Sequence, residues 1–231
     1  MKKLFRYFTV GELILWLASV TTVIVSFCLF DRQNYLSLSA SLIGVTALIF
    51  CAKGNPIGQG MMIVFCLLYG VISLTYSYYG EMMTYLGMSL PMATVSLIAW
   101  LRNPFGDSKA QVKVNKVGKK EFLILIGITA AVTVASYFIL KTFGTANLLT
   151  STFSVTTSFF AAYLTFRRSP YFALAYAIND IVLIILWIMA TIEDISYISV
   201  IICFAVFLVN DLHSFIKWKI MEKTQAMIDE P

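Results

Sequence analysis

Eight apolar segments, each close to the length of a membrane-spanning helix, follow one another along this chain. A bilayer core is about 30 Å thick, so a spanning helix needs about 20 predominantly apolar residues. Hydrophobic residues make up 59% of the 231 residues and charged residues only 13%. The sequence therefore predicts an all-α integral membrane protein with eight transmembrane helices. The segments are residues 10–30, 35–52, 57–79, 82–101, 121–140, 146–166, 170–191 and 196–216.

The first segment follows three basic residues, as the apolar region of a signal peptide does. No small-x-small cleavage site follows its end at "SFCLF". We therefore expect it to be retained as a helix.

The basic residues are distributed unevenly between the two ends of the predicted helices. With a cytoplasmic N terminus, the outer loops hold only Arg32 and Lys141. The cytoplasmic segments hold Lys2, Lys3, Arg6, Lys53, six basic residues from Arg102 to Lys120, Arg167, Arg168, Lys217, Lys219 and Lys223. An excess of Lys and Arg in cytoplasmic loops sets membrane orientation, so both termini are predicted to be cytoplasmic. Seven or nine helices would break this partition at one end.

Two parts of the chain resemble each other at an offset of 112–114 residues. "SASLIGVTALIFCAKGNP" resembles "TSTFSVTTSFFAAYLTFRRSP", with Pro56 matching Pro170 and Glu81 falling near Glu193. Each copy holds three helices in the same orientation, because one helix between the copies restores the direction. Parallel repeats of this kind occur in SWEET-type transporters, whose substrates bind near the membrane midplane at the repeat interface.

We predict a single transmembrane domain over residues 1–231 with a 1+3+1+3 arrangement. Its parts are an additional N-terminal helix at 10–30, repeat 1 at 35–101, a linker helix at 121–140 and repeat 2 at 146–216.

Two Asn-Asp pairs, Asn179-Asp180 and Asn210-Asp211, lie within otherwise apolar segments. A carboxylate near the centre of a membrane helix costs roughly 2.5–3.5 kcal/mol on insertion, so it indicates a functional site by default. Counted from the cytoplasmic ends of their helices at 1.5 Å per residue, the two pairs differ in depth by only roughly 5 Å. Amides suit ribose hydroxyls and a carboxamide, a carboxylate can offset a cationic ring, and nearby aromatic rings can stack on it.

Three stretches resemble the PnuC-type vitamin transporters, whose best-known member moves nicotinamide riboside. They are "YLGMSLPMATVSLIAWLRNP" (85–104), "LTFRRSPYFALAYAINDIVLIILW" (164–187) and "VFLVNDLHSFIKW" (206–218). The likeness covers the second to eighth helices. It implies uptake of nicotinamide riboside by facilitated diffusion across the bacterial inner membrane. Phosphorylation by a cytoplasmic kinase would then retain the substrate for NAD biosynthesis, and the protein would be a homo-oligomer.

The resemblance also implies site residues. The family's asparagines of the seventh and eighth helices fall on Asn179 and Asn210, and its tryptophan of the seventh helix on Trp187. The family's Trp-x-x-Trp falls on Phe172 and Ala175, and the glutamine after Leu-Pro-Met on Ala93. These departures keep other substrates open: a deoxyribonucleoside, thiamine or riboflavin. Phe172, Tyr171 or Tyr176 would then stack on the ring.

The expected substrate-binding residues are Asn179, Asn210, Asp180, Tyr176, Phe172, Trp187 and Asp211. No catalytic residue, metal, cofactor or nucleic acid is expected. Structural roles stay open for several of these side chains. The asparagines can join helices by hydrogen bonds, and the aspartates can be protonated or bonded to a carbonyl. Trp16, Trp100 and Trp218 are interpreted as packing or interface residues, and His213 as a hydrated residue near the cytoplasmic boundary.

Other function classes have less support in the sequence. No Walker A motif, HExxH or nucleophile elbow is present, so ATP-driven pumping and hydrolysis lack their usual residues. An enzyme would use Asp180 and Asp211 as a catalytic carboxylate pair, and a structural or signalling protein would leave both Asn-Asp pairs without a ligand. Coupling to ions stays open. Cys28, Cys51, Cys66 and Cys203 have no paired spacing, which indicates packing residues.

Overall fold

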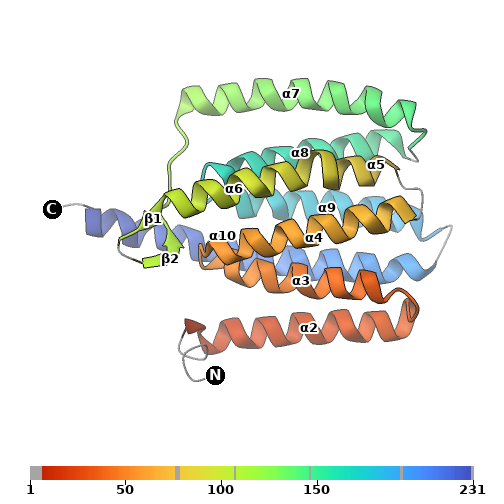
Figure 1. Ribbon diagram of the computed structural model, residues 1–231, viewed down its shortest axis with the longest axis horizontal. Coiled ribbons are helices and arrows are strands. Elements are labelled where there is room, and N and C mark those ends of the chain that lie inside the picture. The colour runs from red at the N-terminus through yellow and green to blue at the C-terminus, as the bar shows by residue number, and fades with distance from the viewer. Residues whose placement is uncertain (1–6, 76–78, 107, 146, 193–194, 230–231) are drawn as a thin grey trace.

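The helices run side by side along one direction in the computed structural model, which describes residues 7–75, 79–106, 108–145, 147–192 and 195–229 (Figure 1). The helices are α2 (Val10–Phe30), α3 (Tyr35–Ala52), α4 (Pro56–Thr75), α5 (Tyr79–Met82), η1 (Met83–Ser89), α6 (Leu90–Arg102), α7 (Lys119–Thr142), α8 (Leu148–Phe166), α9 (Phe172–Ala190), η2 (Ile195–Tyr197) and α10 (Ile198–Asp229). A small antiparallel hairpin joins β1 (Pro104–Phe105) to β2 (Ser108–Val112).

The predicted all-α membrane class is confirmed. Within the described residues, seven helices are long and apolar enough to cross a membrane, namely α2, α3, α4, η1 with α6, α7, α9 and α10. α8 has a similar length, but eight of its 19 residues are Ser or Thr, which lowers its hydropathy. The count of eight spans therefore stays a prediction. Lys2, Lys3, Arg6 and Glu193, which entered the charge and repeat arguments, lie outside the described residues.

Six of the helices form a closed ring. α3 packs against α4, α4 against α6, α6 against α8, α8 against α9, α9 against α10, and α10 against α3. α2 lies outside the ring against α3 and α10, and α7 lies outside it against α8, at opposite edges of the molecule (Figure 1). The contact between α3 and α10 depends on Gly44, because a Cβ there would lie 2.6 Å from the Phe207 ring. The ring is thus tightly closed at this seam.

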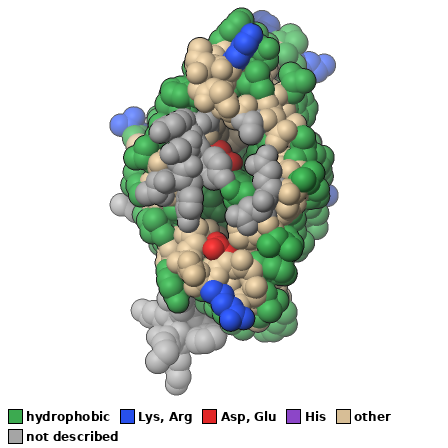
Figure 2. Space-filling view, turned by 90° about the vertical axis from the view of Figure 1, so that its right-hand side faces the viewer, with side chains coloured by type: hydrophobic (Ala, Val, Ile, Leu, Met, Phe, Trp, Pro, Cys, Tyr) green, Lys and Arg blue, Asp and Glu red, His purple; other side chains and the backbone are tan. Residues whose placement is uncertain are grey.

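The outer surface of the bundle is apolar, as lipid contact requires. α2 exposes Val10 and Ile14, and α7 exposes Leu123, Ile124 and Phe138. Figure 2 looks onto the end of the bundle opposite the start of α2 and the end of α10. Hydrophobic side chains cover its flanks and few basic side chains are visible.

The helix between residues 79 and 102 changes its winding in the middle. Met83–Ser89 forms a π-helix immediately before Pro91. Proline has no N–H, so one carbonyl of the preceding turn loses its intrahelical donor. The segment also packs closely on α4, since a Cβ at Gly70 would lie 2.3 Å from Leu86. π-Helical turns occur often at functional sites, and this one faces the interior of the ring.

The start of α2 and the end of α10 lie at the same end of the bundle (Figure 1). There Glu12, whose side chain is 1% exposed, forms ion pairs with Lys53 at 3.1 Å and Lys217 at 3.0 Å. A second pair, Glu121 with Arg167, joins α7 to the residue after α8. The two outer helices, α2 and α7, are thus each held by a glutamate that pairs with the basic residue after the next helix in the sequence.

α10 continues to Asp229, well beyond the apolar segment that ends at residue 216. Its extension is held by Gln225, which accepts a hydrogen bond from the Val114 N–H at 2.8 Å and donates one to the Val112 carbonyl at 3.0 Å. The polar segment between α6 and α7 is therefore packed against the end of α10.

Candidate functional site

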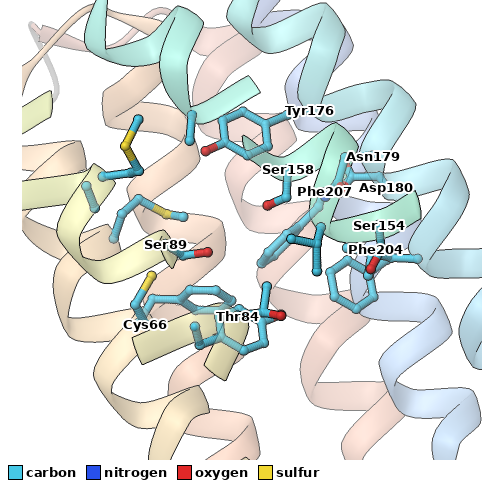
Figure 3. Close-up of a pocket in the computed structure, with 18 of the residues that line it drawn as sticks. Cys66, Thr84, Ser89, Ser154, Ser158, Tyr176, Asn179, Asp180, Phe204 and Phe207 are labelled. Carbon is cyan, nitrogen blue, oxygen red and sulfur yellow. The ribbon is translucent and has the colours of Figure 1, made fainter. Parts of the chain in front are cut away.

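The ring encloses a cavity with a volume of about 130 Å³. Every ring helix contributes side chains to its wall, as does η1, so the cavity lies between the two halves of the chain. Figure 3 shows Ser158 and Tyr176 on one side of this space and Ser89 on the other. Side chains from both predicted repeats therefore line the cavity.

α8 supplies a polar wall. Ser151, Ser154, Ser158 and Thr165 all line the cavity, and their spacings of three, four and seven residues place them on one face of the helix. Thr84 and Ser89 of η1 add two more hydroxyl groups. Sequence reasoning missed this wall, although the unusual density of Ser and Thr at helical spacing in 150–158 was a visible signal for it.

Asn179 of α9 lines the cavity and is buried at 5% exposure. Its Oδ1 accepts a 2.8 Å hydrogen bond from the Thr157 hydroxyl of α8. The same hydroxyl also lies 3.1 Å from the carbonyls of Phe153 and Ser154, and the contact with Asn179 is the shortest of the three. With Oδ1 on Thr157, Nδ2 is a donor without a protein partner among the described residues. The amide of Asn179 thus combines a hydrogen bond to α8 with a place in the cavity wall.

Asp180 of α9 and Asp211 of α10 also line the cavity, and each is only 3% exposed. The two carboxyl groups lie within hydrogen-bonding reach of each other. Oδ2 of Asp180 and Oδ1 of Asp211 are buried and have no hydrogen-bond partner among the described residues. The carboxylates that the sequence placed at similar depth are therefore adjacent.

Asn210 joins two helices by hydrogen bonds, which is the structural role that the sequence left open for it. It does not line the cavity; its Nδ2 donates to the Ser19 hydroxyl of α2 at 2.9 Å and to the Val206 carbonyl at 2.8 Å. Its neighbour Asp211 points inward because consecutive helical residues are rotated by about 100°. Asn210 thus joins α10 to the outer helix α2.

The three predicted aromatic residues all line the cavity, at different heights. Phe172 lies at one end, with its ring 4.9 Å from that of Trp218, and Tyr176 is next to it at 6.4 Å. Trp187 lies nearer the other end, 5.1 Å from Tyr197. Tyr171, in contrast, is 51% exposed and does not line the cavity, so it is not placed to stack on a ligand there.

The remaining tryptophans and the histidine do not line the cavity. Trp100 and Trp218 are fully buried, and their indole N–H groups donate to the carbonyls of Thr165 and Cys51 at 2.9 Å and 2.8 Å. Trp16 donates to the Thr46 hydroxyl. His213 does not line the cavity and interacts electrostatically with Glu12, Lys53 and Lys217.

A second aromatic cluster was missed by sequence reasoning. Phe65 of α4 lies 5.9 Å from Phe207 of α10 and 6.1 Å from Tyr85 of η1, and all three line the cavity. Phe207 precedes Asp211 by one helical turn and so shares its face, which is the one sequence signal that pointed to it. The cavity is therefore bounded by aromatic rings from both halves of the chain.

The family profile described as "Nicotinamide mononucleotide transporter" matches residues 34–220. The chain belongs to this family. The predicted resemblance is confirmed, and the chain is a multi-pass membrane protein of a transporter family whose members carry small molecules.

Two relatives agree with this family membership. The nicotinamide riboside transporter PnuC of Neisseria mucosa is 22% identical over 201 residues, which cover 85% of this chain and 76% of the relative. A solved structure described as the vitamin B3 transporter PnuC superposes with a TM-score of 0.81, at 21% identity, and covers 94% of both chains. At that identity the solved structure establishes a shared fold.

Proposed function

We propose that this protein carries nicotinamide riboside across the membrane and that the cavity inside the helix ring is its binding site. The observation that supports this most is the position of Asn179, which Thr157 orients with Nδ2 left as a donor. The named relative is a nicotinamide riboside transporter, which supports the same substrate. Six residues make up the proposed site: Phe172, Tyr176, Asn179, Asp180, Trp187 and Asp211.

Each part of nicotinamide riboside has a chemical counterpart in the cavity. Asn179 can hydrogen-bond the ribose or the carboxamide, and the serines and threonines of α8 can bind hydroxyl groups. Asp180 can offset the positive charge of the pyridinium ring. Phe172 and Tyr176 supply aromatic faces for stacking and cation–π attraction. Small-molecule sites commonly combine an apolar, aromatic wall with a few such polar groups.

A second candidate is a deoxyribonucleoside or another uncharged nucleoside. Ala93 lines the cavity at the position of the family's glutamine and removes a polar group there, which favours a different base. Ala175, at the position of one of the family's paired tryptophans, does not line the cavity. Thiamine and riboflavin remain further alternatives.

We further propose facilitated diffusion, followed by trapping through a cytoplasmic kinase, and a homo-oligomer in the bacterial inner membrane. The sequence contains no ATP-binding motif, which favours transport down the substrate gradient. Proteoliposomes should then equilibrate the substrate without a gradient of protons, sodium ions or ATP. Accumulation above the external concentration after an ion gradient is imposed would contradict this mechanism.

We infer a topology of eight spans in the 1+3+1+3 arrangement with both termini cytoplasmic. Ring order supports the repeats: α3, α4 and α6 are followed around the ring by α8, α9 and α10, so each helix lies three positions from its predicted counterpart. The start of α2 and the end of α10 lie at one end of the bundle, which supports an even number of spans.

The proposed substrate is tested by binding of four ligand types to the purified protein: nicotinamide riboside, thymidine, thiamine and riboflavin. Nicotinamide riboside should bind most tightly. Tighter binding of thymidine would move the assignment to the second candidate, and binding of none of the four would contradict a vitamin or nucleoside site in this cavity.

A further inference from the structure

Asp180 and Asp211 form a carboxyl pair in which the two groups are close enough to affect each other's charge, so the pair differs from a single counter-charge for the substrate. The two groups come from neighbouring helices, lie within hydrogen-bonding reach and line the same cavity. Two ionised carboxylates at such a distance and away from water repel each other strongly, which favours a proton on one of them. A hydrogen bond between them requires the same proton. Oδ2 of Asp180 and Oδ1 of Asp211 are buried and have no hydrogen-bond donor as partner among the described residues.

The groups around the pair supply no compensating charge. The thiol of Cys51 on α3 and the phenol of Tyr176 on α9 interact electrostatically with Asp211, and the thiol of Cys203 on α10 interacts with Asp180. Unperturbed thiols and phenols are neutral at pH 7. The pair therefore has to obtain positive charge from a proton or from a ligand.

The rest of the cavity wall, as far as the structure describes it, supplies no positive charge either. The described lining residues of α4, η1, α6 and α8 contain Cys66, Tyr85, serines and threonines but no Lys, Arg or His, and α5 adds one further carboxyl group, Glu81. The charged group at the end of the bundle, Glu12, Lys53, Lys217 and His213, is not part of the lining.

We propose that Asp180 and Asp211 share one proton in the unliganded cavity and that a cationic substrate displaces it. The proton leaves the carboxyl pair for water, and the positive ring of the substrate takes its place beside two carboxylates. No covalent bond changes. An uncharged ligand of the same shape leaves the proton in place. Asp211 is then a specificity-determining residue, because it makes the pair selective for a monocation.

This inference rests on the proposed function and is tested with a matched ligand pair. Nicotinamide riboside is cationic, whereas its reduced form, dihydronicotinamide riboside, has nearly the same shape and no charge. Proton release on binding is measured by calorimetry in two buffers of different ionisation enthalpy, between about pH 5.5 and 8.5. We expect nicotinamide riboside to release close to one proton and its affinity to fall as the pH is lowered. The reduced form should release none.

The variant for this test is Asp180→Asn combined with Asp211→Asn, which should bind the oxidised form more weakly than the unmodified protein does and without proton release. Its retained binding of the reduced form shows that it is folded. Glu121→Gln is the control, since Glu121 pairs with Arg167 outside the cavity, and it should behave as the unmodified protein does. Nicotinamide riboside that binds without proton release at every pH overturns the inference alone. Release that persists in the double variant also overturns it. Failure of both forms to bind to the unmodified protein overturns the proposed function together with this inference.

Discussion

The hydroxyl of Thr157 on α8 donates a 2.8 Å hydrogen bond to Oδ1 of Asn179 on α9. This bond joins the polar wall of the cavity to the helix that carries the Asn-Asp pair. It fixes which end of the amide is a donor toward the cavity, because the acceptor end is occupied. The orientation of Asn179 is therefore set by a neighbouring helix before any ligand is bound.

Thr157→Val should weaken nicotinamide riboside binding by about five- to tenfold. The change keeps the shape but leaves Oδ1 of Asn179 without its donor, and a lost hydrogen bond of this kind costs about 1–1.5 kcal/mol. Thr133→Val is a matched control, because it removes the 2.8 Å hydroxyl bond between Thr133 and Thr156 and Thr133 does not line the cavity. Equal affinities of the two variants in a binding titration would show that Thr157 has no positioning role.

Asp180→Asn should weaken nicotinamide riboside much more than dihydronicotinamide riboside. The substitution keeps the size of the side chain and removes only its charge, so the cationic ring loses its nearest counter-charge while an uncharged ring does not. Dissociation constants of both ligands for the unmodified protein and the variant give the comparison. Similar losses for the two ligands would make Asp180 a structural residue.

Glu12→Gln should destabilise the protein by about 1–3 kcal/mol. The Glu12 carboxylate is almost fully buried and pairs with both Lys53 and Lys217, and removing one partner leaves the other charges without compensation. The lysines are partly exposed, which keeps the effect below that of a fully buried pair. Thermal unfolding in detergent measures the loss. Glu222→Gln, which removes the neighbouring i,i+3 pair with Lys219, should change stability by less than about 1 kcal/mol; a loss as large as that of Glu12→Gln would refute the special role of the buried pair.

The predicted topology is tested with reporter fusions. A reporter that is active only in the cytoplasm should be active after Pro231 and silent between Ile192 and Ile195. The reason is the charge partition, because only Arg32 and Lys141 are assigned to the outer loops. A silent fusion at the C terminus would overturn the eight-span model.

The helices were predictable because their length and apolar character follow from the bilayer. Val10–Phe30 and Tyr35–Ala52 agree with the predicted segments at both ends. The extension of α10 was not predictable, since its hold on the hairpin through Gln225 depends on contacts more than 110 residues apart in sequence. The hairpin lies in a polar stretch, and the only strand signal there is the short alternation of Ala110, Val112 and Val114 with polar residues.

The candidate site was predictable only in part. Asn179, Asp180 and Asp211 stood out because polar groups are costly in lipid, and all three line the cavity. The same argument applied equally to Asn210, and only the rotation of α10 shows that this amide faces Ser19 on α2. Phe65 and Tyr85 gave no signal, because aromatic residues in apolar helices are ordinary packing residues until the fold places them beside a cavity.

The most direct test of the central claim is uptake of labelled nicotinamide riboside into proteoliposomes that contain either the unmodified protein or Asn179→Ala. The account predicts that the unmodified protein equilibrates the label across the membrane without any ion gradient. Asn179→Ala should reduce the initial rate to near that of protein-free liposomes, although it unfolds at a similar temperature. Uptake by Asn179→Ala at the unmodified rate would contradict the proposed site, and absence of uptake by the unmodified protein would contradict the proposed function.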